Sequence, residues 1–226
     1  MDVNVKASSE EKLTRARQDY LKALYHLGGG AGNVSTTQLA ERLAVAPASV
    51  TEMLATLRTL DLVIYDRYRG ASLTRQGVAA ALQTIRRHRL IELFLVEMLG
   101  YSWDEVHDEA ERMEHVISRR MEERIFEALG RPDLDPHGDP IPSASGKIAR
   151  EVYRTLAETQ TGEQVTIRRV SDRDPRKLRV MRELDLRPGR TVEVLAGSLY
   201  ESPIEIAVGR RRRQVPLGIA REVFVD

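Results

Sequence analysis

The chain has 226 residues, 31% charged and 42% hydrophobic, an ordinary balance for a globular protein with room for one or two domains and a small third. The absence of cysteine excludes a disulfide scaffold, a thiolate nucleophile, a cysteine zinc finger and an iron–sulfur cluster. A formal net charge of +1 points to no particular partner. The polar first residues resemble no signal peptide and no run of 18 apolar residues occurs, so we expect a cytoplasmic protein without a membrane span.

The first third of the chain alternates helical and extended patterns. Apolar residues recur at helical spacing over 12–27, and a glycine-rich stretch ends this helix. Ser35 or Thr36 can cap a second helix, and a third helix is expected over 47–60, with Pro47 in its first turn. Residues 62–74 then favour two short strands around a turn at Arg69-Gly70. This order predicts a winged helix-turn-helix.

The remainder divides at a loop rich in proline and glycine, residues 130–147. Before it, the pattern predicts a long helix from Thr74 to about Leu99 and another from Ser102, as its N-cap, to about Leu129. After it come a helix-like stretch over 148–159, a helical piece at 175–184, and short strands at 163–170, 191–200, 203–210 and 219–225. Such strands favour a small β-barrel.

We therefore expect a mainly α protein with a small β domain, divided into three parts. These are a winged helix-turn-helix DNA-binding domain at 1–74, a helical domain at 75–145 and a small β-barrel at 146–226. Charge divides along the chain as well. Between Ser35 and Arg89 eight arginines oppose four acids, and between Trp103 and Glu123 eight acids oppose three arginines. This pattern suggests an anionic partner for the first block and a cation for the second, although two solvated helical faces would also produce it.

The third predicted helix and the hairpin carry the candidate DNA-binding residues. A major groove admits one α-helix, and small or hydroxyl side chains near the helix start allow close approach to phosphates and base edges. Arginines on the hairpin can straddle the backbone or enter the minor groove. The candidates are Thr36, Ala48, Ser49, Thr51, Glu52, Arg67 and Arg69. Helix-turn-helix units also serve as protein-interaction modules, so the pattern alone leaves that alternative open.

Three of the five histidines stand beside glutamates at helical offsets. They form the pair His88 and Glu92 and the set His107, Glu111, Glu114 and His115. On one helix the second set would share a side, where crowded carboxylates repel each other without a cation. A divalent ion removes that repulsion and accepts imidazole ligands, and such oxygen and nitrogen donors suit Mn(II) or Fe(II). A solvated acidic face with incidental histidines is the alternative.

The sequence resembles the diphtheria-toxin-repressor family of metal-dependent transcriptional regulators over residues 12–142. The resemblance lies, in chain order, in VAPASVTEMLATLRTLDLVIYDRYRGASLTRQG, RRHRLIELFL, VHDEAERMEHVIS and HGDPIP. Later, DLRPGRTVEV resembles the small β-barrel of ferrous-iron-transport A proteins, which longer family members carry. The resemblance implies a homodimer, held by the helices after the wing, that binds a palindromic operator when loaded with metal.

The resemblance also implies two metal sites. The primary site would comprise Asp19, Glu111, Glu114 and His115, with His88 nearby or shared, and the ancillary site would comprise His88, Glu92 and His107. Iron-type members have Cys at the position of Glu111 and Met at that of Asp19. Both are carboxylates here, as in manganese-type members, which favours Mn(II) over Fe(II).

The chain departs from the family pattern at two places. Lys22 stands where manganese-type members can carry a second acid one turn after Asp19. Ser171 stands where iron-type members have an acid in the barrel, so that Asp172 or Asp174 could substitute only with some shift. The first departure argues against a two-metal cluster of the manganese type, and the second against a barrel ligand at the usual position.

The sequence thus predicts a metal-dependent repressor that controls metal-ion uptake and homeostasis. In this prediction Mn(II) links the first helix to the dimer helices. One alternative is an Fe(II)-dependent regulator of iron homeostasis. Another is a metal-independent DNA-binding protein whose histidines and glutamates are structural. A small metal-dependent hydrolase is a further alternative, but the sequence offers no evident nucleophile or glycine-rich phosphate loop. We therefore do not expect an enzyme.

Overall fold

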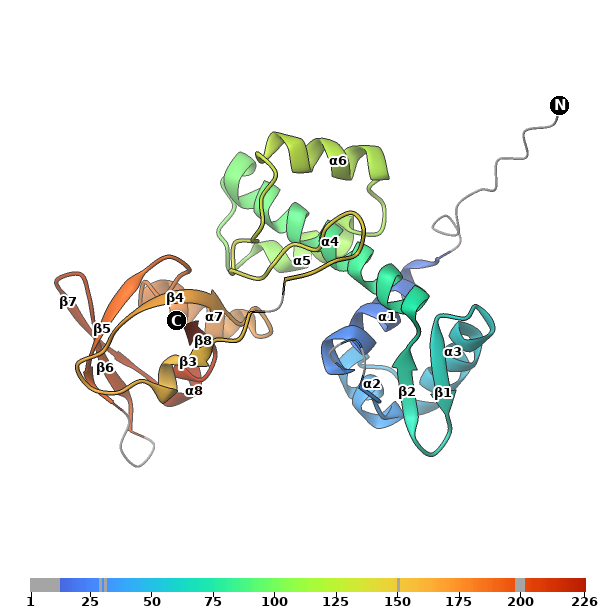
Figure 1. Cartoon of the computed structure of the whole chain (residues 1–226), viewed down its shortest axis with the longest axis horizontal. Coiled ribbons are helices and arrows are strands. Elements are labelled where there is room, and N and C mark those ends of the chain that lie inside the picture. The colour runs from blue at the N-terminus through green and yellow to red at the C-terminus, as the bar shows by residue number, and fades with distance from the viewer. Residues whose placement is uncertain (1–12, 29, 31, 150, 198–201) are drawn as a thin grey trace. The chain divides into compact units, whose positions relative to one another are not determined.

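The computed structural model describes residues 13–226 except 29, 31, 150 and 198–201 (Figure 1). The chain forms two compact units. The first extends to Arg87 and includes 142–147, and the second comprises 88–141 and 148–226. The division falls within the long helix α4 (Arg75–Leu99). In the described part of the chain, no helix is both long and apolar enough to cross a membrane.

The first unit has the element order of a winged helix-turn-helix. Its elements are α1 (Arg15–Gly28), α2 (Thr36–Leu43), α3 (Pro47–Thr59), β1 (Val63–Asp66), β2 (Gly70–Leu73) and the first half of α4. Ser35, rather than Thr36, caps α2. Its hydroxyl accepts a hydrogen bond from the Gln38 N–H at 3.2 Å, and the Gln38 side chain accepts from the Ser35 N–H at 2.9 Å.

The hairpin packs on the same apolar core as the three helices. Leu21, Leu39 and Leu54, one from each helix, are fully buried there. Gly70 begins β2 with φ +86°, and a Cβ atom at that position would lie 2.3 Å from the Val34 carbonyl oxygen. Glycine is therefore required where the hairpin approaches the segment before α2.

The second unit contains the rest of α4 together with α5 (Val106–Met113) and α6 (Arg119–Ala128). The expected single helix from Ser102 to Leu129 is wrong, because residues 114–118 interrupt it. Two β-branched residues with low helix propensity precede Ser118, whose hydroxyl caps α6 by accepting from the Met121 N–H at 3.2 Å. Ser102 caps no helix.

The C-terminal part is a six-stranded antiparallel sheet in the order β3-β8-β4-β5-β6-β7. In chain order its elements are β3 (Arg154–Thr155), β4 (Gln164–Val170), α7 (Pro175–Glu183), β5 (Thr191–Ala196), β6 (Ile204–Val208), β7 (Arg211–Val215), α8 (Leu217–Ala220) and β8 (Val223–Val225). The small β domain is as predicted, but the described strands form no closed barrel, because β3 and β7 are the two edges of the sheet.

The expected strand over 219–225 forms only at Val223–Val225, because Leu217–Ala220 are the helix α8. Two further local predictions in this part differ from the structure. The expected helix over 148–159 does not form. Leu156 is buried in the β core, and only a short 3-10 helix (Leu156–Glu158) follows β3. The strand β7 was not predicted, since its arginine run lacks an alternating pattern of apolar residues. Tertiary packing and strand pairing decide both segments.

Candidate metal centre and DNA-binding surface

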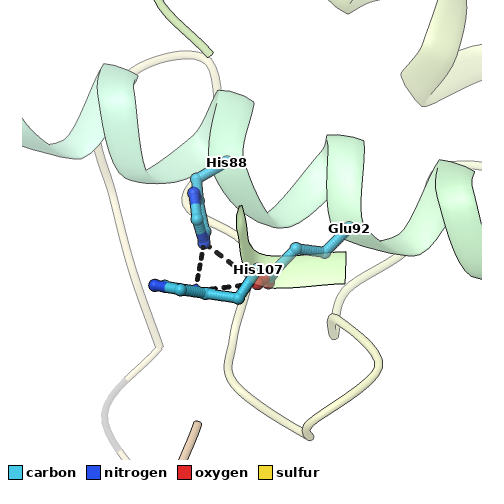
Figure 2. Close-up of side chains that lie close together, drawn as sticks. All are labelled: His88, Glu92 and His107. Carbon is cyan, nitrogen blue, oxygen red and sulfur yellow. Dashed lines mark hydrogen bonds and ion pairs between the residues drawn. The ribbon is translucent and has the colours of Figure 1, made fainter. Parts of the chain in front are cut away.

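Three side chains from two helices converge on one point in the second unit (Figure 2). His88 and Glu92 stand one turn apart on α4, and His107 belongs to α5. Glu92 Oε1 lies 2.9 Å from His88 Nε2 and 3.3 Å from His107 Nδ1. One potential ligand atom from each residue lies within 4.8 Å of the others, so the three form a candidate metal-binding cluster.

A second cluster lies at the end of α5. Glu111 belongs to the helix, Glu114 is its C-cap and His115 follows in the next turn. Their ligand atoms also lie within 4.8 Å of one another. The prediction that these residues lie on one continuous helix is wrong, because α5 ends at Met113 and Glu114 and His115 belong to the turn that follows. In that turn His115 Nε2 lies 3.3 Å from Glu114 Oε1. The remaining predicted ligand, Asp19, is a partly buried residue of α1 in the first unit.

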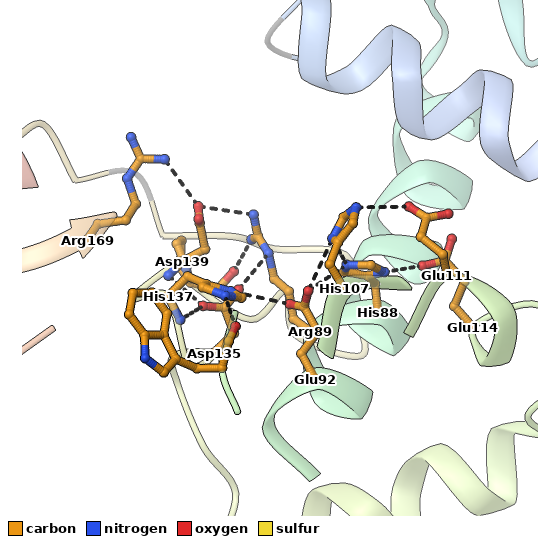
Figure 3. Close-up of polar contacts among 12 residues, drawn as sticks. His88, Arg89, Glu92, His107, Glu111, Glu114, Asp135, His137, Asp139 and Arg169 are labelled. Atoms are coloured by element: carbon orange, nitrogen blue, oxygen red, sulfur yellow. Dashed lines mark hydrogen bonds and ion pairs between the residues drawn. The ribbon is translucent and has the colours of Figure 1, made fainter. Parts of the chain in front are cut away.

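Imidazoles and carboxylates connect the two clusters (Figure 3). His88 Nδ1 lies 2.5 Å from Glu114 Oε2, and His107 Nε2 lies 3.8 Å from Glu111 Oε1. Each of these contacts pairs an imidazole of one cluster with a carboxylate of the other. This arrangement balances charge in an interior where an isolated carboxylate would be costly.

A third cluster comprises Glu92, His137 and Asp172, again with ligand atoms within 4.8 Å. His137 is fully buried in the loop after α6, and Asp172 follows β4 of the β domain. His137 has no predicted role beyond its place in the motif HGDPIP. The spacing of Asp135, His137 and Asp139, three potential ligands at alternate positions, was a signal that could have identified it.

The loop that carries His137 is held rigidly. Asp135 Oδ1 accepts hydrogen bonds from the N–H groups of His137 at 2.8 Å and Asp139 at 2.9 Å. The carbonyl of His137 accepts from the Val170 N–H of β4 at 2.9 Å. Gly138 has φ +86°, and a Cβ there would lie 2.1 Å from the carbonyl oxygen of the facing β4 residue. The backbone of this loop is therefore fixed against the β domain.

The pKa values of these buried groups depend on one another. Burial alone would raise the pKa of Glu92, but the charge of His88 and the facing His107 and His137 hold it well below its ordinary value. Burial alone would lower the pKa of His137, yet Glu92 raises it to about 10. The pKa of Asp135 rises to about 7 because of its burial and the neighbouring carboxylates. The carboxylates thus require positive charge beside them.

The donor set fits a divalent ion. Glu92 Oε2 and His137 Nδ1 lie 3.7 Å apart, and both are buried without a hydrogen-bond partner among the described residues. Oxygen and imidazole donors without thiolate suit Mn(II) and Fe(II). A divalent ion could therefore supply the positive charge that protonated imidazoles otherwise provide.

The candidate DNA-binding residues lie mainly on exposed surface of the first unit. On α3 the exposed residues alternate with a buried stripe of Val50, Leu54 and Leu57. The exposed candidates are Ala48, Ser49, Thr51 and Glu52 on α3 and Arg67 and Arg69 on the hairpin tip, while Thr36, the first residue of α2, is half-buried. This separation leaves one face of α3 available to a partner.

The hairpin tip between β1 and β2 has a defined backbone. The Asp66 carboxylate accepts hydrogen bonds from the N–H groups of Tyr68 at 2.8 Å and Arg69 at 3.0 Å. Such an Asx turn presents the side chains of the tip to solvent in a fixed order. A winged helix-turn-helix together with a buried histidine–carboxylate cluster is typical of DNA-binding proteins that respond to metal.

Comparison with known proteins agrees with this class over nearly the whole chain. Family models match three successive segments: the iron dependent repressor N-terminal DNA binding domain at residues 12–71, the iron dependent repressor metal binding and dimerisation domain at 74–143, and the FeoA domain at 154–226. A solved structure described as a manganese-dependent transcriptional repressor in complex with manganese is 38% identical, with a TM-score of 0.83, and the match covers 92% of this chain and 98% of that one.

Curated relatives show the same similarity. The diphtheria toxin repressor of Corynebacterium jeikeium (strain K411) is 31% identical over 160 residues, covering 69% of this chain and 67% of the relative. The iron-dependent repressor IdeR of Mycobacterium leprae (strain TN) is 36% identical over 123 residues, or 54% of each chain, so the match spans about half of that relative. The chain belongs to this family of metal-dependent transcriptional repressors, whose members are not enzymes.

Proposed function

We propose that this chain is a metal-gated repressor that binds operator DNA as a homodimer when loaded with Mn(II), and thereby controls metal-ion uptake and homeostasis. The observation that carries the proposal is the environment of Glu92. Its carboxylate is fully buried and faces the imidazoles of His88, His107 and His137, which come from three separate segments. A buried constellation of this kind is costly as mere packing and is typical of a functional site.

Two groups of residues would hold metal. One is Glu111, Glu114 and His115, to which we assign Asp19 as a further ligand on the basis of the family resemblance. The other is centred on Glu92, which offers Oε1 to His88 and His107 and Oε2 to His137, with Asp172 as the ligand from the β domain. The bound ion supplies positive charge, which allows carboxylates from separate elements to be held together.

The ligand set supports Mn(II) as the effector. Glutamate, aspartate and histidine are hard to borderline donors, and the chain has no cysteine to favour a softer ion. The similar solved structure is described as a manganese-dependent repressor, whereas the mycobacterial relative is named iron-dependent. An Fe(II)-dependent regulator of iron homeostasis is therefore the second candidate, supported by that relative.

The DNA-binding step would use the exposed face of α3 and the hairpin. Ala48 and Ser49 in the first turn of α3 allow close approach to a groove, and Arg67 and Arg69 place positive charge at the hairpin tip. A homodimer would present two such helices to a palindromic operator. Met98, at the C-terminal end of α4, is 55% exposed and provides apolar surface for a second subunit.

Metal-dependent binding can be tested with a selected duplex in place of the natural operator. Random-sequence duplexes enriched on the Mn(II)-loaded protein would provide the probe, and fluorescence anisotropy would measure its affinity with Mn(II), with anaerobic Fe(II) and with excess EDTA. We expect EDTA to weaken binding about 5- to 150-fold, the range of typical allosteric couplings. Equal affinity under all three conditions would identify a metal-independent DNA-binding protein instead.

Glu111→Ala tests the site assignment. This residue is partly exposed, so its replacement should leave the fold intact while removing the metal response of DNA binding. Asp19→Asn should produce the same loss if α1 completes the site. Glu109→Ala, an acidic residue of the same helix, is the matched control and should respond to metal as the wild type does. A Glu111→Ala protein that still requires metal to bind DNA would show that the ligand assignment is wrong.

A further inference from the structure

The single tryptophan of the chain lies in the turn before α5, beside the candidate metal centre. The Trp103 side chain is partly buried against the apolar core of the β domain. Its carbonyl oxygen lies 2.7 Å from His137 Nε2, and the two rings have centroids 5.7 Å apart. The turn therefore contacts both a candidate metal ligand and the domain that carries Asp172.

The carbonyl of Trp103 determines which nitrogen of His137 can bind metal. A carbonyl only accepts hydrogen bonds, so Nε2 must carry a hydrogen. In the neutral ring the lone pair is then on Nδ1, the atom that faces Glu92. Metal-binding histidines are commonly oriented in this way by an acceptor on their second nitrogen.

An ion pair between a half-exposed arginine and a buried aspartate ties this turn to the β domain. The Asp104 side chain is 1% exposed, and its Oδ1 accepts a hydrogen bond from Arg182 Nη1 of α7 at 2.9 Å. Arg182 Nη1 also lies 2.8 Å from Ser102 Oγ, which in turn donates to Asp104. Three polar groups thus join the turn before α5 to a helix of the β domain.

Two of the other contacts of the β domain with the His137 loop do not orient the imidazole. The hydrogen bond from the Val170 N–H and the close approach at Gly138 act on the backbone of the loop. The His137 ring is contacted instead by the Trp103 carbonyl at Nε2 and faces Glu92 at Nδ1, with Asp172 in the same cluster. The contacts of Arg182 with Ser102 and Asp104 tie the turn that carries this carbonyl to α7.

We propose that Arg182 is a positioning residue, which holds the turn at Ser102–Asp104 against α7 and thereby orients His137 for metal. Because α7 begins three residues after Asp172, the same ion pair also holds Asp172, the candidate ligand of the β domain, close to His137 and Glu92. This inference rests on the proposed metal-dependent function. It assigns the β domain a role in shaping the site in addition to its candidate ligand.

Arg182→Ala in the full-length chain tests the inference, with Mn(II) as the probe. Free Mn(II) measured by electron paramagnetic resonance reports the affinity of each class of site, and Trp103 emission reports on the turn. We expect one class of site to weaken about 10- to 100-fold, as for other supporting contacts of metal ligands, while a second class is unchanged. Trp103 emission should shift to longer wavelength in the metal-free protein as the turn leaves α7.

Two further variants provide controls. Arg179→Ala removes a neighbouring exposed arginine of α7 and should leave both measurements at their wild-type values. Arg182→Lys retains a charged donor and should recover part of the affinity. If circular dichroism shows that Arg182→Ala does not fold, the Mn(II) affinity of Arg182→Lys tests the positioning role in its place.

The outcomes separate this inference from the proposed function. A wild-type chain that binds no Mn(II) would overturn the proposed function, and the positioning role with it. Wild-type binding with undiminished affinity in Arg182→Ala would overturn the positioning role alone. A shift of Trp103 emission without a change in affinity would also overturn it, because the ion pair would then be only structural.

Discussion

The helical part at 88–141 and the β domain at 154–226 are built on opposite principles. In the described residues of the β domain sixteen hydrophobic side chains are buried, and the only buried polar residues are Thr159 and Ser171. In the helical part eight hydrophobic side chains are buried together with seven ionisable ones. These seven are His88, Glu92, Asp104, Glu114, Glu122, Asp135 and His137.

This difference shows where each part obtains its stability. An apolar core is stabilised by burial alone, at about 25 cal/mol per Å² removed from water, and requires no ligand. A core with so many ionisable groups must balance charge, and imidazoles do so only while they are protonated. A bound divalent ion would provide that balance over a wider pH range. The helical part is therefore the part whose stability should respond to metal.

The largest expected effect is that of Glu92→Gln. This change preserves the shape of the side chain but removes the negative charge that faces His88, His107 and His137. Breaking a buried ion pair on one side typically costs about 3–5 kcal/mol of stability. Urea unfolding and Mn(II) binding should both show a large loss. Glu97→Gln changes an exposed glutamate of the same helix and is the control. Equal losses of stability in the two variants would contradict the view that buried charges stabilise the helical part.

Ile206→Ala should destabilise the β domain by about 2–5 kcal/mol whether or not metal is present. The side chain is fully buried in strand β6, so its removal leaves a cavity in an apolar core. Ile206→Val should cost only about 0.5–1.5 kcal/mol. Urea unfolding with Mn(II) and with EDTA provides the measurement. A loss that Mn(II) abolishes would mean that the two parts do not differ as described.

Metal addition gives the third test. Mn(II) at about 100 times its dissociation constant should stabilise the native state by about 2.7 kcal/mol, provided that the unfolded chain does not bind it. Hydrogen exchange followed by mass spectrometry should locate the added protection mainly in residues 88–141 and, within the β domain, around the candidate ligand Asp172. Equal protection throughout residues 154–226 would argue against a metal response centred on the helical part and Asp172.

The smallest expected effect concerns the Lys177–Glu222 pair of the β domain, 2.8 Å apart. Burial alone would raise the pKa of Glu222, but hydrogen bonds from Lys177 and Ser171 bring it below its ordinary value. The pair therefore stabilises the fold above the ordinary pKa of glutamate, and this contribution disappears as the pH falls through the folded-state pKa. Glu222→Gln should cost less than about 1 kcal/mol at pH 7. If Glu222→Gln lowers the free energy of unfolding equally at acidic pH, the pair does not make this pH-dependent contribution.

Local signals were sufficient for the first unit and for the pairing of histidine with glutamate. Ser35, Pro47 and Gly70 act on the backbone within a few residues, so the order of helices and strands follows from short-range chemistry. His88 and Glu92 were recognisable because one helical turn places both on the same side of α4.

Long-range packing decided the rest. The break at residues 114–118 is an exception with local causes, because two β-branched residues and the Ser118 cap end one helix and begin the next although the helical spacing continues. Residues 148–159 have a helix-like sequence pattern, but Leu156 is instead buried in the apolar core of the β domain. For Leu156 the free energy gained by burial in the β core exceeds that of the weak local preference for a helix.

The sequence by itself determined the winged helix-turn-helix, the small β domain and most of the residue types of the candidate metal centre, because these depend on spacing within single elements. Only the tertiary structure brought His137 and Asp172 to Glu92, since they lie 45 and 80 positions along the chain from it. No periodicity links residues so far apart. Their meeting depends on the rigid loop after α6 and on the docking of the β domain.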